Sequence, residues 1–253
     1  MWDISPEPIL DYQLRLSVMD TKDVPCEDAE GTSDVFIKAY IDDTDKRTTD
    51  THYRCQNGEA SFNYRINFDV KAPRKDYLLV LQAWDFDVFK KNDYICEWTL
   101  DLKPLFDNAR LTQQPIQLTK NYYNAFLKEK MPKGCHIDFR DDDTFFLGTA
   151  KDGKLIKIRL DLRIIPGEQA KKNPVGSARV EPNMKPYLPP PVGRIQFSLN
   201  PFKMLSQLMS KEFMAKFMSI FLVILCCALL IAMAPMILSN FISTITLKIF
   251  GIS

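Results

Sequence analysis

Histidine is scarce in this sequence: 253 residues contain only His52 and His136, and no two of the six cysteines form a CxxC pair. Zinc sites need several His or Cys ligands at short spacing, so these residues provide no zinc motif. The chain also lacks a GxSxG motif and any Ser, His and Asp arrangement with a suitable histidine. These absences predict that the chain is not an enzyme, and they exclude a lipid hydrolase with the usual nucleophile motif.

An excess of charge is also missing, because the formal net charge is only +1. Nucleic-acid binding requires a basic face on the folded part, so no nucleic-acid partner is predicted. The few basic residues of the last 60 positions nevertheless outnumber the single acidic residue there, Glu212; they are Arg194, Lys203, Lys211, Lys216 and Lys248. With no secretory signal near Met1, the scattered cysteines of the larger part are expected to be reduced cytosolic thiols.

A long run without charge lies near the C-terminus, where Phe217–Leu247 contains no Asp, Glu, Lys, Arg or His. As a helix, Phe217–Leu238 would span about 33 Å, enough to cross a hydrocarbon core of about 30 Å. A buried core helix is the weaker alternative, because such a helix usually keeps a polar face. The run therefore predicts a single transmembrane helix at 217–238 and a short lumenal or extracellular tail at 239–253.

The lysines around this run predict its orientation. Lys203, Lys211 and Lys216 precede it, and only Lys248 follows it. By the positive-inside rule the N-terminal side is cytosolic, which predicts a single-pass tail anchor in a vesicle or plasma membrane. Residues 204–216 form a basic juxtamembrane segment that would be attracted to an anionic leaflet.

Strand-period alternation dominates residues 1–166 and is clearest in four segments: Tyr12–Val18, Val35–Ile41, Leu79–Ala83 and Ile156–Ile164. Several short strands separated by turn residues predict an all-β, antiparallel sandwich. Helical period appears only around Lys103–Arg110, and residues 121–153 are predicted to be an irregular insertion. Residues 167–203 are rich in proline, which favours a stiff, extended linker.

Two acidic loops carry the chemistry. The first contains Asp28 and Asp34, and the second contains Asp85, Asp87 and Asp93. Each loop borders a strand, so its carboxylates should gather at one end of the sheet. Calcium prefers six to eight oxygen ligands, and two carboxylates about 4 Å apart repel by about 4 kcal/mol at an effective dielectric near 20. Aspartate is also common in ordinary turns, but both spacings together favour a calcium site.

Apolar residues flanked by lysine suggest where the same loops would meet a membrane. Val24 and Pro25 precede the first acidic cluster, and Val88 and Phe89 stand beside Lys90 and Lys91 in the second loop. Such tips suit a loop that dips into lipid headgroups. The alternative, that Phe89 packs back on the sandwich, stays open. Asp141, Asp142 and Asp143 have no partner cluster and are expected to be a solvated turn.

The acidic pattern Asp28-x-x-Gly31-x-Ser33-Asp34, followed by Asp85-x-Asp87-x5-Asp93, resembles the calcium loops of C2 domains. The chain is also similar to the C-terminal end of ferlins. The stretches that carry this likeness are Tyr12–Arg15 with Thr21–Val24, Thr49–Arg54 with Asn57–Glu59 and Phe62–Arg65, Lys172–Gly176 with Ala178, Arg179 and Glu181–Asn183, and Asn200–Lys203.

This resemblance implies an eight-stranded C2 sandwich whose five aspartates hold two or three calcium ions, helped by the backbone carbonyls of Glu27 and Phe86. It also implies calcium-dependent binding to anionic phospholipid membranes in vesicle fusion, membrane trafficking or membrane repair, with fusion-machinery proteins as candidate partners. The alternative is a membrane-anchored adaptor that docks partner proteins and in which calcium is structural.

Overall fold

The computed structural model describes residues 8–26, 31–56, 58–87, 90–128, 136–208 and 211–251. The chain forms two compact units, Met1–Arg194 and Ile195–Ser253. Each unit is described by itself below.

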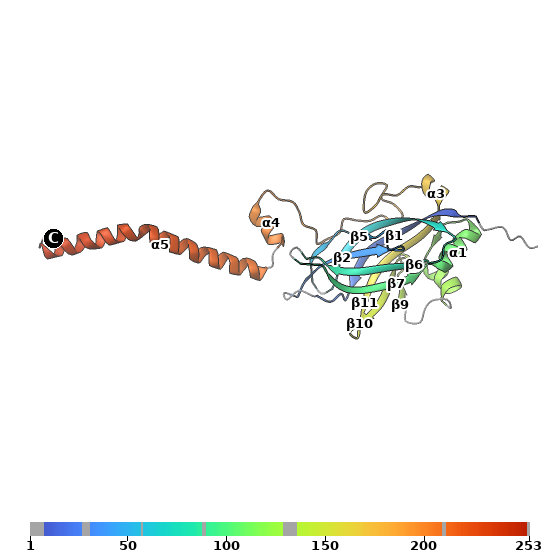
Figure 1. Cartoon of the computed structure of the whole chain (residues 1–253), viewed down its shortest axis with the longest axis horizontal. Coiled ribbons are helices and arrows are strands. Elements are labelled where there is room, and N and C mark those ends of the chain that lie inside the picture. Colours follow the sequence, from blue (N-terminus) through green and yellow to red (C-terminus); the bar gives the residue numbers. More distant parts are fainter. Residues whose placement is uncertain are drawn as a thin grey trace, which may run out of the picture. The chain divides into compact units, whose positions relative to one another are not determined.

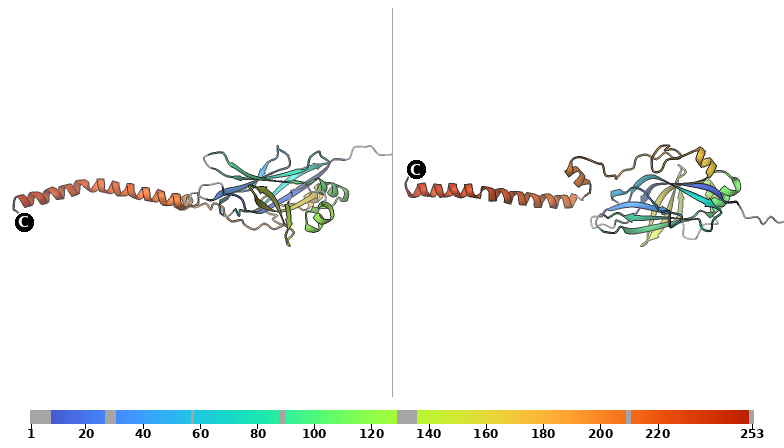
Figure 2. Two further views of the ribbon diagram at one scale, coloured as in Figure 1. Left: turned by 90° about the horizontal axis from the view of Figure 1, so that it is seen from below. Right: turned by 45° about the horizontal axis from the view of Figure 1, so that its top comes forward.

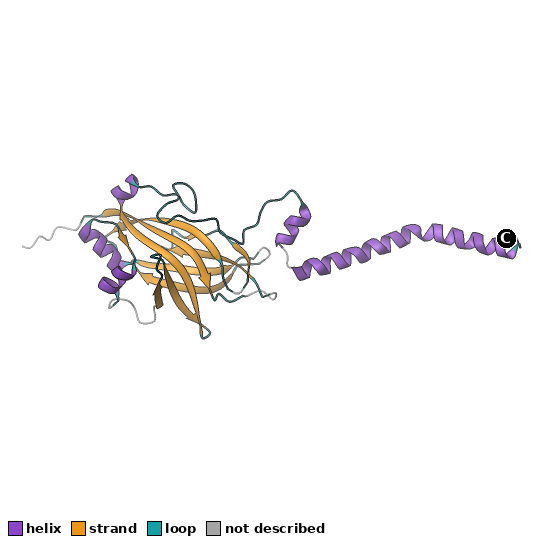
Figure 3. Ribbon diagram, turned by 180° about the vertical axis from the view of Figure 1, so that it is seen from behind, coloured by secondary structure: helices purple, strands orange, loops and turns teal. Residues whose placement is uncertain are grey.

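The first unit contains two antiparallel sheets packed face to face (Figures 1 and 3). The first sheet has the order β5-β1-β11-β10-β9, with β8 paired to β11. Its strands are β1 (Leu10–Lys22), β5 (Ser61–Ala72), β8 (Ile116–Gln117), β9 (His136–Phe139), β10 (Phe145–Lys151) and β11 (Lys154–Pro166). The second sheet has the order β3-β2-β6-β7, with β4 paired to β2. Its strands are β2 (Ser33–Tyr40), β3 (Arg47–Thr48), β4 (His52–Cys55), β6 (Leu78–Asp85) and β7 (Asp93–Asp101).

Alternating apolar residues explain this packing, because successive side chains of a strand point to opposite faces. Leu14 and Leu16 of β1 and Leu79 and Leu81 of β6 are fully buried in one continuous core. Each large apolar side chain buried in this way contributes about 1.5–3 kcal/mol relative to exposure. The predicted antiparallel sandwich is confirmed. The described residues form eleven strands rather than eight, because short edge strands pair separately.

The segment 121–153 corrects the prediction of an irregular insertion. After α1 (Lys103–Thr112), which lies where helical period was found, come α2 (Lys120–Tyr122) and the π-helical turn η1 (Tyr123–Leu127). Strands β9 and β10 follow. Phe145 and Leu147 of β10 are buried and Phe145 pairs with Leu160 of β11, so tertiary packing makes this segment part of the first sheet.

The two ends of the sandwich differ in what they carry. At the loop end, β1 leads to β2, β4 leads to β5 and β6 leads to β7. At the far end, β1 begins and β11 ends, as the pairing of Tyr12 with Pro166 shows. Both acidic loops therefore belong to the loop end.

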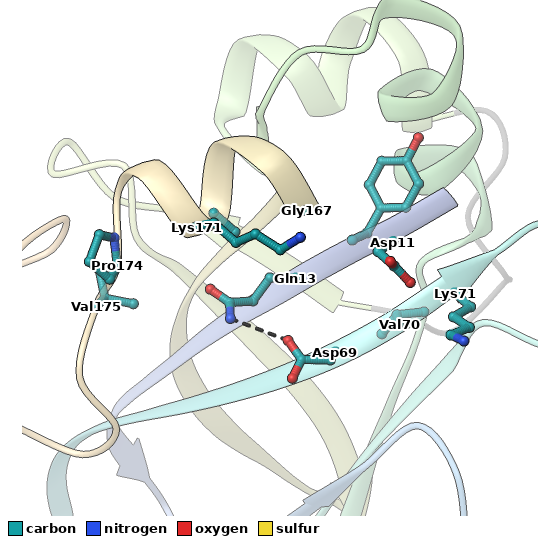
Figure 4. Close-up of a pocket in the computed structure, with 11 residues that line it drawn as sticks. Asp11, Gln13, Asp69, Val70, Lys71, Gly167, Lys171, Pro174 and Val175 are labelled. Atoms are coloured by element: carbon teal, nitrogen blue, oxygen red, sulfur yellow. Dashed lines mark hydrogen bonds between the residues drawn. The ribbon is translucent and has the colours of Figure 1, made fainter. Parts of the chain in front are cut away.

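Residues 167–194, here called the strap, pack along the first sheet instead of forming the free linker that the proline content predicted. The strap begins with α3 (Gly167–Lys172) at the far end. A cavity of about 470 Å³ lies between its first turns and the strands β1 and β5, where Lys171 and Val175 stand beside Gln13 and Asp69 (Figure 4). Figure 2 shows the strap passing over the sandwich from α3. Within the strap, the side chains of Leu188 and Asn183 are buried.

The second unit contains α4 (Pro201–Leu208) and α5 (Lys211–Ile249). Within α5, Ala215–Ile249 is long and apolar enough to cross a membrane, and its most apolar window is 0% buried. The helix ends at Ile249 and so includes most of the residues 239–253 that were predicted to be a short tail.

Candidate functional site

Strand register brings three of the predicted aspartates together at the loop end. Val35 of β2 pairs with Asp85 of β6, and Asp85 pairs with Asp93 of β7. Asp34 directly precedes Val35. Three neighbouring strands therefore place one acidic residue each at the same edge of the second sheet, as the sequence predicted from two separate loops.

Asp85 and Asp34 fasten the ends of β2 and β6 to each other. The Asp85 side chain is only 3% exposed, and its Oδ1 accepts a hydrogen bond of 2.6 Å from the backbone N–H of Asp34. In return, the backbone N–H of Phe86 donates to the Asp34 carbonyl over 2.8 Å. Asp34 Oδ1 accepts from the backbone N–H of Arg54 over 2.7 Å. These contacts hold both carboxylates in fixed positions beside the loops.

Lys90 joins the other two aspartates. Its Nζ lies 2.7 Å from Asp93 Oδ2 and 3.3 Å from Asp87 Oδ2. The contacts with Asp93 and then with Asp87 raise the pKa of Lys90 to about 12, so it carries a full charge. The backbone N–H of Asp87 donates to Asn92 Oδ1 over 3.1 Å, which orders the turn. The Lys90 ammonium thus lies where these carboxylates attract a cation.

The described acidic residues fit a hard cation in their chemistry. All of their side-chain donors are carboxylate oxygens, the ligands that calcium prefers. Asp87 Oδ2 is buried and lies 3.3 Å from the Lys90 ammonium, with no other polar partner among the described residues. Within the same described ranges, no three His, Cys, Asp or Glu side chains are close enough to hold a metal ion. Asp28 and the Glu27 carbonyl lie outside the described residues.

Of the two predicted lipid-contact residues of the first loop, one is buried and the other is partly exposed. Val24 is 3% exposed, and its N–H donates to the Gly58 carbonyl over 3.3 Å. The prediction that Val24 contacts lipid is therefore wrong in this structure, because its side chain packs in the core. Gly58 must be glycine here: its φ is +72° and an added Cβ would lie 2.4 Å from Val24 N. Pro25 is partly exposed.

Among the residues predicted to contact lipid, the described ones that are fully exposed are lysines. Lys90 and Lys91 are exposed, while Val88 and Phe89 lie outside the described residues. A cavity of about 640 Å³ opens beside Pro25 and is also lined by Lys154 and Lys157 of β11. These two lysines were missed from the sequence. Their only local signal is the turn Asp152-Gly153, which brings the start of β11 to the loop end.

These features define the class of protein. A family model described as "C2 domain" matches residues 12–118, and the two-sheet antiparallel sandwich of the first unit is a C2 domain. A solved structure of a C2 domain from plant Extended Synaptotagmin 1 is similar at 16% identity and a TM-score of 0.39, covering 64% of this chain and 98% of that one.

Curated relatives give the family. Myoferlin of Xenopus tropicalis is 30% identical over 232 residues, which cover 75% of this chain and 11% of the relative. Ferlin 1 of Toxoplasma gondii is 31% identical over 184 residues, covering 71% of this chain and 11% of the relative. The chain belongs to the ferlin-like C2 proteins, and it spans about a tenth of the length of the relatives it matches.

Proposed function

We propose that this chain is a calcium-dependent phospholipid-binding module, anchored in a membrane by α5, that acts in membrane trafficking, vesicle fusion or membrane repair. The observation that supports it most is that Asp34, Asp85, Asp87 and Asp93 all lie at one end of a C2 sandwich, where Asp87 and Asp93 already bind the ammonium group of Lys90.

The proposed ligands are the side chains of these four aspartates, together with Asp28 and the backbone carbonyls of Glu27 and Phe86. When bound, calcium supplies positive charge at an end of the domain that is otherwise acidic. Asp85, held by the Asp34 N–H, is already fixed in position. Asp87 and Asp93 are neutralised by Lys90 in this structure. If calcium neutralises Asp87 and Asp93 instead, the Lys90 ammonium becomes available to lipid phosphate groups.

The lipid would meet the lysines of the loop end, of which Lys90, Lys91 and Lys154 are exposed and Lys157 is partly buried. Lys90, Lys91, Lys154 and Lys157 provide ammonium groups, and the cavity beside Pro25 offers space for a headgroup. Each lysine near an anionic leaflet adds about 1 kcal/mol of attraction. The proposed orientation of α5 places the C2 domain in the cytosol, following the lysines on its N-terminal side.

Sedimentation of residues 1–194 with phosphatidylserine vesicles tests the proposal. Binding should appear with calcium and disappear in EGTA. Asp87→Asn should reduce the calcium-dependent fraction, whereas Asp141→Asn, in an exposed turn, should leave it unchanged. Asp87 is preferable to Asp85 here, because Asp85 also supports the fold through the Asp34 N–H. Equal binding with calcium and with EGTA would contradict calcium dependence.

The second candidate is a membrane-anchored adaptor in which calcium is structural. The observation that favours it is the Asp34–Asp85 hydrogen bond, in which an acidic loop residue fastens two strands. In that case Asp87→Asn lowers the melting temperature measured in calcium and leaves vesicle binding unchanged. The same variant therefore separates the two functions.

A further inference from the structure

We infer that the strap brings the point where the chain leaves the C2 domain to its loop end, so that the domain binds the membrane that holds α5 before any other. This inference rests on the proposed function and adds the identity of the target membrane. It follows from the path of residues 167–194 within the first unit.

The strap runs the full length of the sandwich, from the far end to the loop end. Strand β11 ends at Pro166, beside Tyr12 at the far end. The strap then follows β5 backwards: Asn67 Nδ2 donates to the Val175 carbonyl over 3.5 Å, and Arg65 and Ala178 exchange backbone hydrogen bonds.

The next contacts continue toward the first residue of β5. Arg179 donates to the carbonyls of Phe62 and Asn63 over 2.8 and 3.2 Å, and Arg194 donates to the Ser61 carbonyl over 2.8 Å. Ser61 is the residue that pairs with Asp20 beside the loops. The chain that left the sandwich at the far end has thus been carried back to the loop end.

The last residues of the strap are firmly held there. Asp50 forms ion pairs with both Arg179 and Arg194. The Gly193 carbonyl accepts the backbone N–H of Tyr53 over 2.8 Å. Gly193 also has a φ of +75°, and an added Cβ would lie 2.4 Å from His52 Nε2, so the backbone presses directly on the His52 ring.

The chain leaves the first unit at Arg194, which is here called the exit. Because the strap holds the exit at the loop end, only the residues between Arg194 and the apolar span form the tether to the membrane. Residues 195–214, about 20 in all, separate the exit from the apolar span Ala215–Ile249. Twelve of these residues are helical, in α4 and at the start of α5. At about 1.5 Å per helical residue and about 3.4 Å per extended residue, the segment reaches at most about 45 Å, whereas the strap, if released and extended, would add about 95 Å. A short tether of this kind gives an effective concentration in the millimolar range for a surface it can reach.

Because Arg194 and the acidic loops lie at the same end of the first unit, the tether to α5 begins beside the loops. An anionic lipid in the protein's own membrane therefore competes strongly with the same lipid elsewhere.

The full chain reconstituted in phosphatidylserine vesicles tests this directly. Energy transfer from the protein's tryptophans to a dansyl lipid reports approach to a membrane, with the dansyl lipid placed either in the protein's own vesicles or in added vesicles of identical composition. We expect calcium to give at least about ten times more transfer to the protein's own vesicles at equal lipid concentration.

Matched variants isolate the strap. A 60-residue Gly/Ser insertion after Arg194 leaves the strap contacts in place and should lower this preference several-fold, since the effective concentration falls steeply as a flexible tether lengthens. Gly193→Ala should also lower it by loosening the exit. Gly153→Ala is its control, because Gly153 has nearly the same φ, +76°, and no atom within 4 Å of an added Cβ.

The outcomes are distinguishable. Equal or greater transfer to the added vesicles, with soluble residues 1–194 still binding lipid in response to calcium, overturns this inference and leaves the proposed function intact. An unchanged preference after the 60-residue insertion also overturns it. Loss of the calcium response in both the full chain and residues 1–194 overturns the proposed function and this inference together.

Discussion

Replacing Arg65 with Met should detach the strap and destabilise the C2 domain. Arg65 lies on β5, and its side chain is 0% exposed. Its guanidinium donates to three strap carbonyls, those of Gly176, Met184 and Pro186, over 3.2, 3.0 and 2.6 Å. Methionine keeps most of the apolar volume but donates none of these hydrogen bonds.

The magnitude follows from those contacts. A hydrogen bond with a charged donor contributes about 1.5–3 kcal/mol, so three of them would give several kcal/mol. Part of this is offset, because burial lowers the pKa of Arg65 and therefore opposes its charge. Removing one partner of a buried polar network typically costs about 3–5 kcal/mol. We expect a loss near the lower limit, about 3 kcal/mol.

Urea unfolding of residues 1–194 measures this loss. The unfolding midpoint should fall, and the slope with denaturant should also fall if the strap is already detached in the folded state. Lys71→Met is the matched control, because Lys71 is on the same strand and exposed; it should stay within about 0.5 kcal/mol. An Arg65→Met domain as stable as this control would refute the structural role of the strap.

Three further outcomes are expected. Lys90→Met should strengthen calcium binding a few-fold in calorimetry of residues 1–194, because no ammonium group then competes with calcium at Asp87 and Asp93. The control Lys91→Met should leave calcium binding unchanged. Weaker calcium binding by Lys90→Met would contradict this prediction. Burial raises the pKa of Cys55 and Cys96 to about 12, so at pH 8 both should resist a thiol reagent until unfolding, and prompt labelling of either would contradict it. Burial lowers the pKa of His52 in the folded state. Just below pH 6.5, therefore, His52 is protonated in more of the unfolded than of the folded molecules, and the free energy of unfolding should fall as the pH drops through this range. His52→Gln should flatten that part of a urea-midpoint curve, and an unchanged slope would exclude His52 as its source.

The sandwich could be predicted because apolar and polar residues alternate within β1, β2, β6 and β11, and this pattern can be seen in each segment of the sequence by itself. Strand β10 was missed because Phe145, Phe146 and Leu147 are consecutive apolar residues rather than an alternating set, and they follow an acidic turn. The strap was missed for a different reason. Proline content predicts extended backbone, but it does not reveal that Arg65 on a distant strand donates hydrogen bonds to that backbone.

The candidate site shows the same division. Convergence of Asp34, Asp85 and Asp93 followed from two loops that border strands. The burial of Val24 and the ion pairs of Lys90 depend on how the loops pack against one another, and no local pattern encodes that. The roles of Asp28 and Glu27 stay predictions, since both lie outside the described residues.

The strap also determines how the domain responds to mechanical tension. The chain enters β1 at the far end and leaves the strap at the loop end, so a pull between Leu10 and Arg194 acts along the strands. The hydrogen bonds that join β1 to β5 and β11 then share the load together instead of opening one after another. Without the strap, both chain ends would lie at the far end and the same pull would peel β1 from β11. A pull between these two points therefore acts in the direction in which the domain resists it best.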